Sequence, residues 1–98
     1  MGQVNWTDEA EQSLRAIFDY IAQDNYEAAS RTVEGIQDRA QLLADYPEIG
    51  YPYHEIPGRH IRILLYGHYR IVYLIKTNAE VDILGVLHGA MNIDRFFQ

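Results

Sequence analysis

The sequence of 98 residues has no cysteine, a single lysine and no long apolar run. Without cysteine the chain can form neither a disulfide framework nor a metal site built on thiolates, which agrees with a reducing compartment. Its first residues have neither the basic nor the apolar region of a secretion signal, and no segment approaches the ~18 apolar residues of a membrane span. We therefore expect a cytoplasmic protein that has no membrane partner.

The chain also lacks the excess of positive charge that is typical of nucleic-acid-binding domains, because its formal net charge is −6. This charge is unevenly distributed. Residues 1–58 contain three arginines against eleven acidic residues, whereas residues 59–98 contain five cations against three acids. Between Arg59 and Lys76 there is no acid at all. The distribution predicts a local surface in the second half of the chain that attracts anions or acidic segments.

A chain of this length predicts a single domain over residues 1–98. The first half of this domain is predicted to be helical. Thr7 is suited to cap a helix, because Asp8 and Glu9 follow it in the first turn, and apolar residues then recur at three- and four-residue steps to about Asp24. Asp24 or Asn25 is suited to cap a second helix. Its apolar positions repeat at steps of four and three: Ala29, Val33, Ile36, Ala40 and Leu43. The two helices form a predicted hairpin.

The remaining segments predict a small sheet. Residues 3–6 form a short strand candidate, and the prolines and glycines of residues 46–58 indicate a loop that leads from the helices to the sheet. Three β-type runs follow, at residues 59–66, 69–76 and 81–88, and their short connections predict an antiparallel meander. The predicted fold is therefore α+β, with a short N-terminal strand and a helical hairpin packed on a small antiparallel sheet, in the order β-α-α-β-β-β.

Two arginines lie within these predicted strands. Arg62 alternates with the apolar residues Ile61 and Ile63, so we expect one face of this strand to cover the helical hairpin and Arg62 to lie on the open face. Arg70 interrupts an otherwise apolar central strand. It is explained either by an ion pair with an acid, such as Glu55 or Asp82, or by a functional role.

The histidines do not indicate a metal site. His54, His60 and His68 are scattered over loop and strand, without the spacing that metal ligands show, so we expect neither a metal nor a cofactor. His88, at the end of a predicted strand, is either a hydrogen-bonded structural or interface residue or a group that transfers protons near neutral pH.

Three segments of the second half resemble a known family: PGRHIRIL at residues 57–64, YGHYRIVY at 66–73 and VDILGVLHG at 81–89. Together with the predicted order of elements, they resemble the RelE/ParE superfamily of bacterial toxins from type II toxin–antitoxin modules. The resemblance extends from Val4 to about Phe97. It implies a toxin that is held inactive by a co-encoded antitoxin, whose C-terminal segment wraps around it.

The resemblance implies one of two activities. RelE-like members cut mRNA in the ribosome; for this chemistry Arg62 and Arg70 would contact phosphate and His88 would transfer a proton. ParE-like members instead poison DNA gyrase. The low basic content and the Val86-Leu87-His88-Gly89 ending favour the ParE side, and hence a non-enzymatic toxin. The alternatives are a ribosome-dependent mRNA endonuclease and a decayed member that only binds its antitoxin.

The mixture of arginine with aromatic and apolar residues on the predicted sheet is typical of protein interfaces. We therefore expect a partner surface there, for the antitoxin or the target. The residues predicted to form it are Arg59, Arg62, Leu64, Tyr66, Arg70 and His88.

Overall fold

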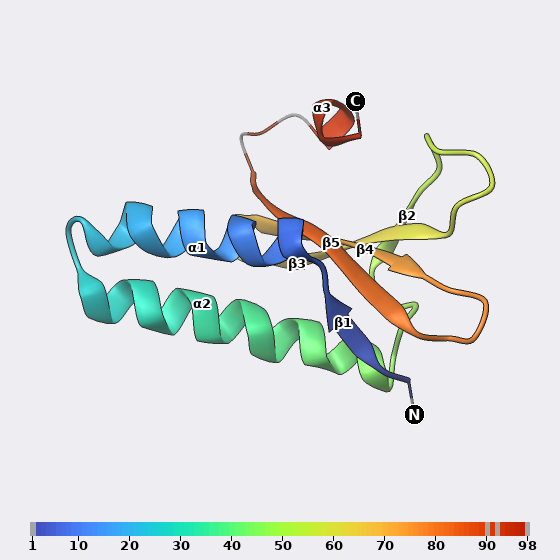
Figure 1. The fold of residues 1–98 in the computed structure, drawn as a ribbon, viewed down its shortest axis with the longest axis horizontal. Coiled ribbons are helices and arrows are strands. Elements are labelled where there is room, and N and C mark those ends of the chain that lie inside the picture. The colour runs from blue at the N-terminus through green and yellow to red at the C-terminus, as the bar shows by residue number, and fades with distance from the viewer. Residues whose placement is uncertain (1, 90, 92, 98) are drawn as a thin grey trace.

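Two long helices and a five-stranded sheet form the α+β fold that the sequence predicts (Figure 1). The structure is a computed structural model, and it describes residues 2–89, 91 and 93–97. The elements follow in the order β1 (Val4–Trp6), α1 (Asp8–Ala22), α2 (Tyr26–Gln41), a 3-10 turn η1 (Leu42–Ala44), β2 (Tyr51–Tyr53), β3 (Ile61–Tyr66), β4 (Tyr69–Ile75), β5 (Val81–His88) and α3 (Ile93–Phe96).

Both helices begin at the side-chain caps that the sequence indicates. The Thr7 hydroxyl accepts a hydrogen bond from the Ala10 backbone N–H at 3.1 Å, and Asn25, one of the two candidates, accepts one from the Ala28 N–H at 3.0 Å. Thr7 also donates to the Ile83 carbonyl at 2.7 Å. The start of α1 is therefore fastened to β5, and this bond fixes the helical hairpin on the sheet.

The sheet has the strand order β1-β5-β4-β3-β2, in which β3, β4 and β5 form the predicted antiparallel meander. β1 lies parallel to β5, with Val4 opposite Val81. β2 was not expected, because the sequence indicates a loop there. Its three residues pair antiparallel with β3, with Tyr51 opposite Ile63. A strand that contains Pro52 is tolerated because it lies at the edge of the sheet.

Both faces of the sheet are covered by apolar side chains, and this reverses the predicted orientation of β3. Leu64 is 4% exposed and lies in the cluster between the sheet and the helical hairpin. Ile61 and Ile63 belong to a second cluster on the opposite face. Arg62 alternates with these isoleucines and therefore lies on the helical side, not on an open face. The alternation of residues in β3 could not show which face of the strand meets the helices, because apolar side chains cover both faces of the sheet.

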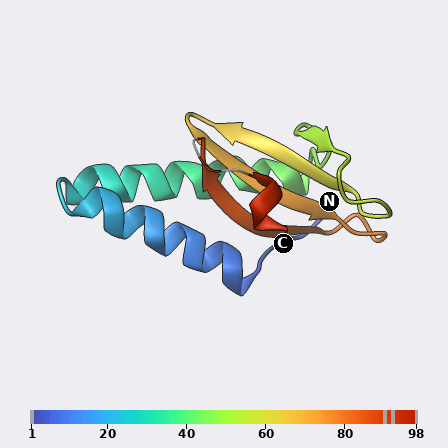
Figure 2. The same cartoon turned by 90° about the horizontal axis from the view of Figure 1, so that it is seen from above.

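The second cluster is completed by α3, which lies against the sheet apart from the helical hairpin (Figure 2). The Phe96 ring packs over Gly85, where an added Cβ would approach it to 2.5 Å. Phe97 stacks on Tyr53, with ring centroids 5.4 Å apart, and the Tyr53 hydroxyl donates to Asp94 at 2.6 Å. Within the described ranges, no helix is long and apolar enough to cross a membrane.

Candidate functional site

The three residues predicted for RNA cleavage are not brought together. Arg62 lies opposite Tyr73 of β4, whereas His88 lies opposite Tyr69. These two positions are about 13 Å apart along β4, at ~3.3 Å per residue. Arg70 alternates with the residues of β4 that face the helices and therefore lies on the other side of the sheet. The structure does not assemble a catalytic centre from these three side chains.

Arg62 donates hydrogen bonds to the loop that precedes β2. Its Nε donates to the Gly50 carbonyl at 2.7 Å, and its terminal nitrogen donates to the Glu48 carbonyl at 3.1 Å. The second terminal nitrogen lies 3.4 Å from Nε2 of His60. Because two of its nitrogens donate to carbonyls of this loop, the guanidinium is a structural element of the loop. The prediction that Arg62 lies on the open face is therefore wrong.

Arg70 does not form the ion pair that the sequence suggested. It donates to the Met91 carbonyl, and its Nε is buried without a hydrogen-bond partner in the described part of the chain. Asp82 is one of the two candidate acids, and its Oδ1 instead lies 3.5 Å from Nζ of Lys76. No ion pair joins Arg70 to Glu55 among the residues that the structure describes. Arg70 thus contacts the segment that follows β5 through its hydrogen bond to Met91.

The other predicted contact residues differ in how well a partner could reach them. Leu64 is buried in the core between the sheet and the helical hairpin, so little of its side chain is open to a partner. Tyr66 is half-buried, and its ring packs over Gly35 of α2 so closely that a Cβ there would collide with the hydroxyl. His88 is exposed and makes an edge-to-face contact with Tyr69, with ring centroids 5.5 Å apart. Arg59 is also exposed.

Of the four cations between residues 59 and 76, Arg59 and Lys76 help to line a hollow of about 550 Å³ at the end of β4, together with His60. Lys76 lies 3.8 Å from Glu80 and 3.5 Å from Asp82, so its charge is largely compensated. The local excess of positive charge is therefore smaller than the sequence implies, because the turn after β4 and the start of β5 place Glu80 and Asp82 beside Lys76.

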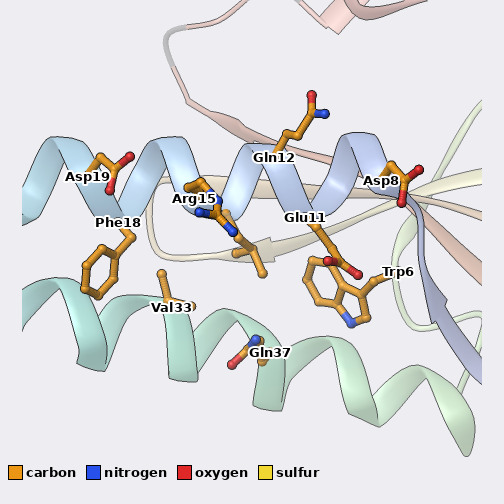
Figure 3. A pocket seen from close by; sticks show the side chains of 10 residues that line it. Trp6, Asp8, Glu11, Gln12, Arg15, Phe18, Asp19, Val33 and Gln37 are labelled. Carbon is orange, nitrogen blue, oxygen red and sulfur yellow. The ribbon is translucent and has the colours of Figure 1, made fainter.

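A larger groove of about 820 Å³ lies on the helical hairpin (Figure 3). Four side chains give it an apolar lining: Trp6, Leu14, Phe18 and Val33. Asp8, Glu11 and Asp19 give it an acidic rim, which also includes Arg15. The groove was missed because its helical apolar residues, Leu14, Phe18 and Val33, belong to the same stripes that face the core. Trp6, placed directly before the helix cap, is the sequence signal of this groove.

Among the residues that the structure describes, no group of three His, Cys, Asp or Glu side chains is arranged to hold a metal ion. The groove and the exposed residues of the sheet are instead surfaces that another protein can contact.

Comparison with known proteins identifies relatives of this chain. Residues 4–93 match the family of the ParE toxin of the parDE type II toxin–antitoxin system. The chromosomal ParDE toxin–antitoxin system from P. aeruginosa includes a chain with 26% identity and a TM-score of 0.71, covering 90% of this chain and 96% of that one. A chain of the RelBE2 toxin–antitoxin complex from Mycobacterium tuberculosis has 24% identity, a TM-score of 0.65 and coverages of 89% and 96%, and it shows the fold alone. No curated protein sequence matches the chain.

Proposed function

Because the chain belongs to the ParE toxin family of type II toxin–antitoxin systems, we propose that it is a growth inhibitor that acts on DNA gyrase and is neutralised by a cognate antitoxin. The family match over residues 4–93 carries this proposal. It is supported by the separation of Arg62, Arg70 and His88, which leaves mRNA cleavage without an assembled set of these groups. The net charge of −6 also makes the chain poorly suited to an environment of ribosomal RNA.

The groove on the helical hairpin is the proposed docking site for a helix of the antitoxin. An amphipathic helix places its apolar face in a hydrophobic groove and its polar residues at the rim. Here four of the ten lining residues are apolar, namely Trp6, Leu14, Phe18 and Val33, and three are acidic, namely Asp8, Glu11 and Asp19. The antitoxin segment is therefore expected to carry basic residues beside its apolar face. The ParDE neighbour belongs to a toxin–antitoxin system, which supports a partner of this kind.

The experiment that tests the target uses purified gyrase, plasmid DNA and ATP. Addition of the chain is expected to leave gyrase covalently joined to cleaved DNA, so that linear plasmid appears after detergent and protease treatment. Prior addition of the antitoxin abolishes the effect. Absence of linear DNA, combined with transcripts cut at defined codons only when ribosomes are present, would identify the chain as an endonuclease instead.

A charge reversal tests the antitoxin site separately. Glu11→Lys changes the acidic rim of the groove and is expected to weaken antitoxin binding several-fold at low salt, because rim charges mainly steer association. Glu34→Lys is the matched control, since Glu34 is also an exposed acid of the hairpin but does not line the groove. Equal effects of the two substitutions would show that only the overall charge matters.

A further inference from the structure

Large apolar side chains are exposed in the connection between α2 and β3. Tyr46 is 60% exposed, and Ile49 and Tyr51 are each 46% exposed. A single exposed apolar residue is ordinary on a protein surface, but several of them close together indicate an interaction site. We refer to residues 46–51 as the 46–51 loop.

The backbone of the 46–51 loop is held from within the chain. The Tyr73 hydroxyl donates to the Pro47 carbonyl at 2.6 Å and accepts from the Gly50 N–H at 3.0 Å. Arg62 donates to the carbonyls of Gly50 and Glu48. Gly50 is buried, and a Cβ there would lie 2.6 Å from the Ile63 carbonyl oxygen. These hydrogen bonds fix the loop while its apolar side chains remain in solvent.

A loop of this kind is organised for binding before a partner arrives. Ordering a mobile loop on association costs conformational entropy, and a loop that is already fixed avoids much of that cost. Exposed tyrosines held on a rigid support are also the side chains most often found among the residues that dominate interface affinity. The hydrogen bonds therefore have a consequence beyond stability, because they present Tyr46, Ile49 and Tyr51 in one arrangement.

We propose that the 46–51 loop docks on the target protein, at an apolar site bordered by basic residues. This inference rests on the proposed function and names the surface by which the toxin reaches its target. Residues 40–58 contain Asp45, Glu48 and Glu55 but no lysine or arginine. Enzymes that handle DNA present basic surfaces to the phosphate backbone, and an acidic loop complements such a surface.

Other occupants suit this loop less well. A two-fold contact between two copies would bring Asp45 and Glu48 of one copy near the same acids of the other. Addition of a strand from another chain is disfavoured, because β2 forms the edge of the sheet and its central residue, Pro52, has no N–H to donate. The antitoxin groove is lined by none of residues 46–51, so the two surfaces can be changed independently.

The test compares two variants of the full chain. Tyr46→Ser/Ile49→Ser removes two exposed apolar side chains of the loop. Tyr20→Ser removes one that is 77% exposed, near the C-terminal end of α1. The loop variant is expected to need about thirtyfold more protein for half-maximal gyrase-dependent DNA cleavage, since truncated hot-spot residues typically cost this much. Its affinity for the antitoxin is expected to stay within about twofold of wild type, and Tyr20→Ser to match wild type in both assays. Circular dichroism confirms that each variant is folded.

Each outcome decides the proposal. Loss of cleavage with unchanged antitoxin binding supports the loop as the target surface. Unchanged cleavage overturns it, and a parallel loss of antitoxin affinity assigns the loop to the antitoxin instead. If the wild-type chain traps no cleaved DNA, the gyrase assignment fails, and growth inhibition becomes the readout. The loop variant must then lose its inhibition of growth while still binding antitoxin; if it inhibits growth like wild type, the loop proposal is wrong as well.

Discussion

Replacing Tyr73 by phenylalanine tests whether its hydroxyl holds the 46–51 loop. The ring is fully buried, so the substitution removes one oxygen and keeps the packing of the core. It leaves the N–H of Gly50, which is buried, and the carbonyl of Pro47, which is half-buried, without the hydroxyl as their hydrogen-bond partner. An unsatisfied buried polar group costs about 1–3 kcal/mol. Because water can reach the half-buried carbonyl, the expected total is about 2 kcal/mol of unfolding free energy.

Urea denaturation and thermal unfolding measure this loss. For a domain of this size, about 2 kcal/mol corresponds to a fall in Tm of roughly 8–16 °C. Tyr51→Phe is the matched control, because Tyr51 is exposed. The free energy of unfolding of this variant is expected to differ from wild type by less than about 0.5 kcal/mol. A loss below about 0.5 kcal/mol for Tyr73→Phe would refute the reasoning, since the loop would then not depend on the hydroxyl.

The same variant has a predicted effect at alkaline pH. Burial raises the pKa of Tyr73 above its ordinary value of 10.0, so the unfolded chain loses this proton before the folded chain does. The contribution of Tyr73 to stability is therefore complete below pH 10 and is lost as the pH rises from 10 through the folded pKa. Tyr73→Phe should lack this component, and its stability should decline less steeply above pH 10 than that of wild type.

Three further predictions concern the rest of the fold. Gly85→Ala is expected to displace α3 with little change in global stability, because the new Cβ meets the movable Phe96 ring. Faster hydrogen exchange confined to residues 93–97 would show this displacement. Wild-type protection of these residues would contradict it. Thr7→Ala should cost about 1–2 kcal/mol in urea denaturation, because the cap and a bond to β5 are both lost, whereas Thr7→Ser should retain most of this. The hydrogen bond to Asp94 raises the pKa of Tyr53 to about 12, so an NMR titration should show this ring ionising late. Asp94→Asn should return the pKa of Tyr53 toward 10.0. An unchanged titration of Tyr53 in this variant would refute the assignment. The stabilising effect of this bond is complete below pH 10 and is lost as the pH rises through 12.

The features predictable from the sequence are those that depend on nearby residues. Thr7 and Asn25 act as caps through bonds to residues three positions away, and the short turns between β3, β4 and β5 predict their antiparallel pairing. β2 is different, because its three residues become a strand only by pairing with β3. The orientation of Arg62 and Leu64 also escaped prediction, since apolar residues cover both faces of the sheet.

The candidate surfaces were less predictable than the fold. Arg59 and His88 are exposed, as a contact residue must be, but Leu64 is not, because the assignment of the sheet faces was reversed. The loop depends on a hydroxyl of Tyr73 that is separated from Pro47 by 26 positions, and no sequence pattern announces such a bond. The groove likewise arises only when the two helices pack side by side.

The most direct test of gyrase poisoning is tightly induced expression of the chain in a bacterium without the antitoxin, with growth and a DNA-damage reporter read together. Gyrase trapped on cleaved DNA predicts growth arrest with the reporter switched on. Growth arrest with a silent reporter would contradict it and place the target in translation, and unimpaired growth would show that the chain is not an active toxin.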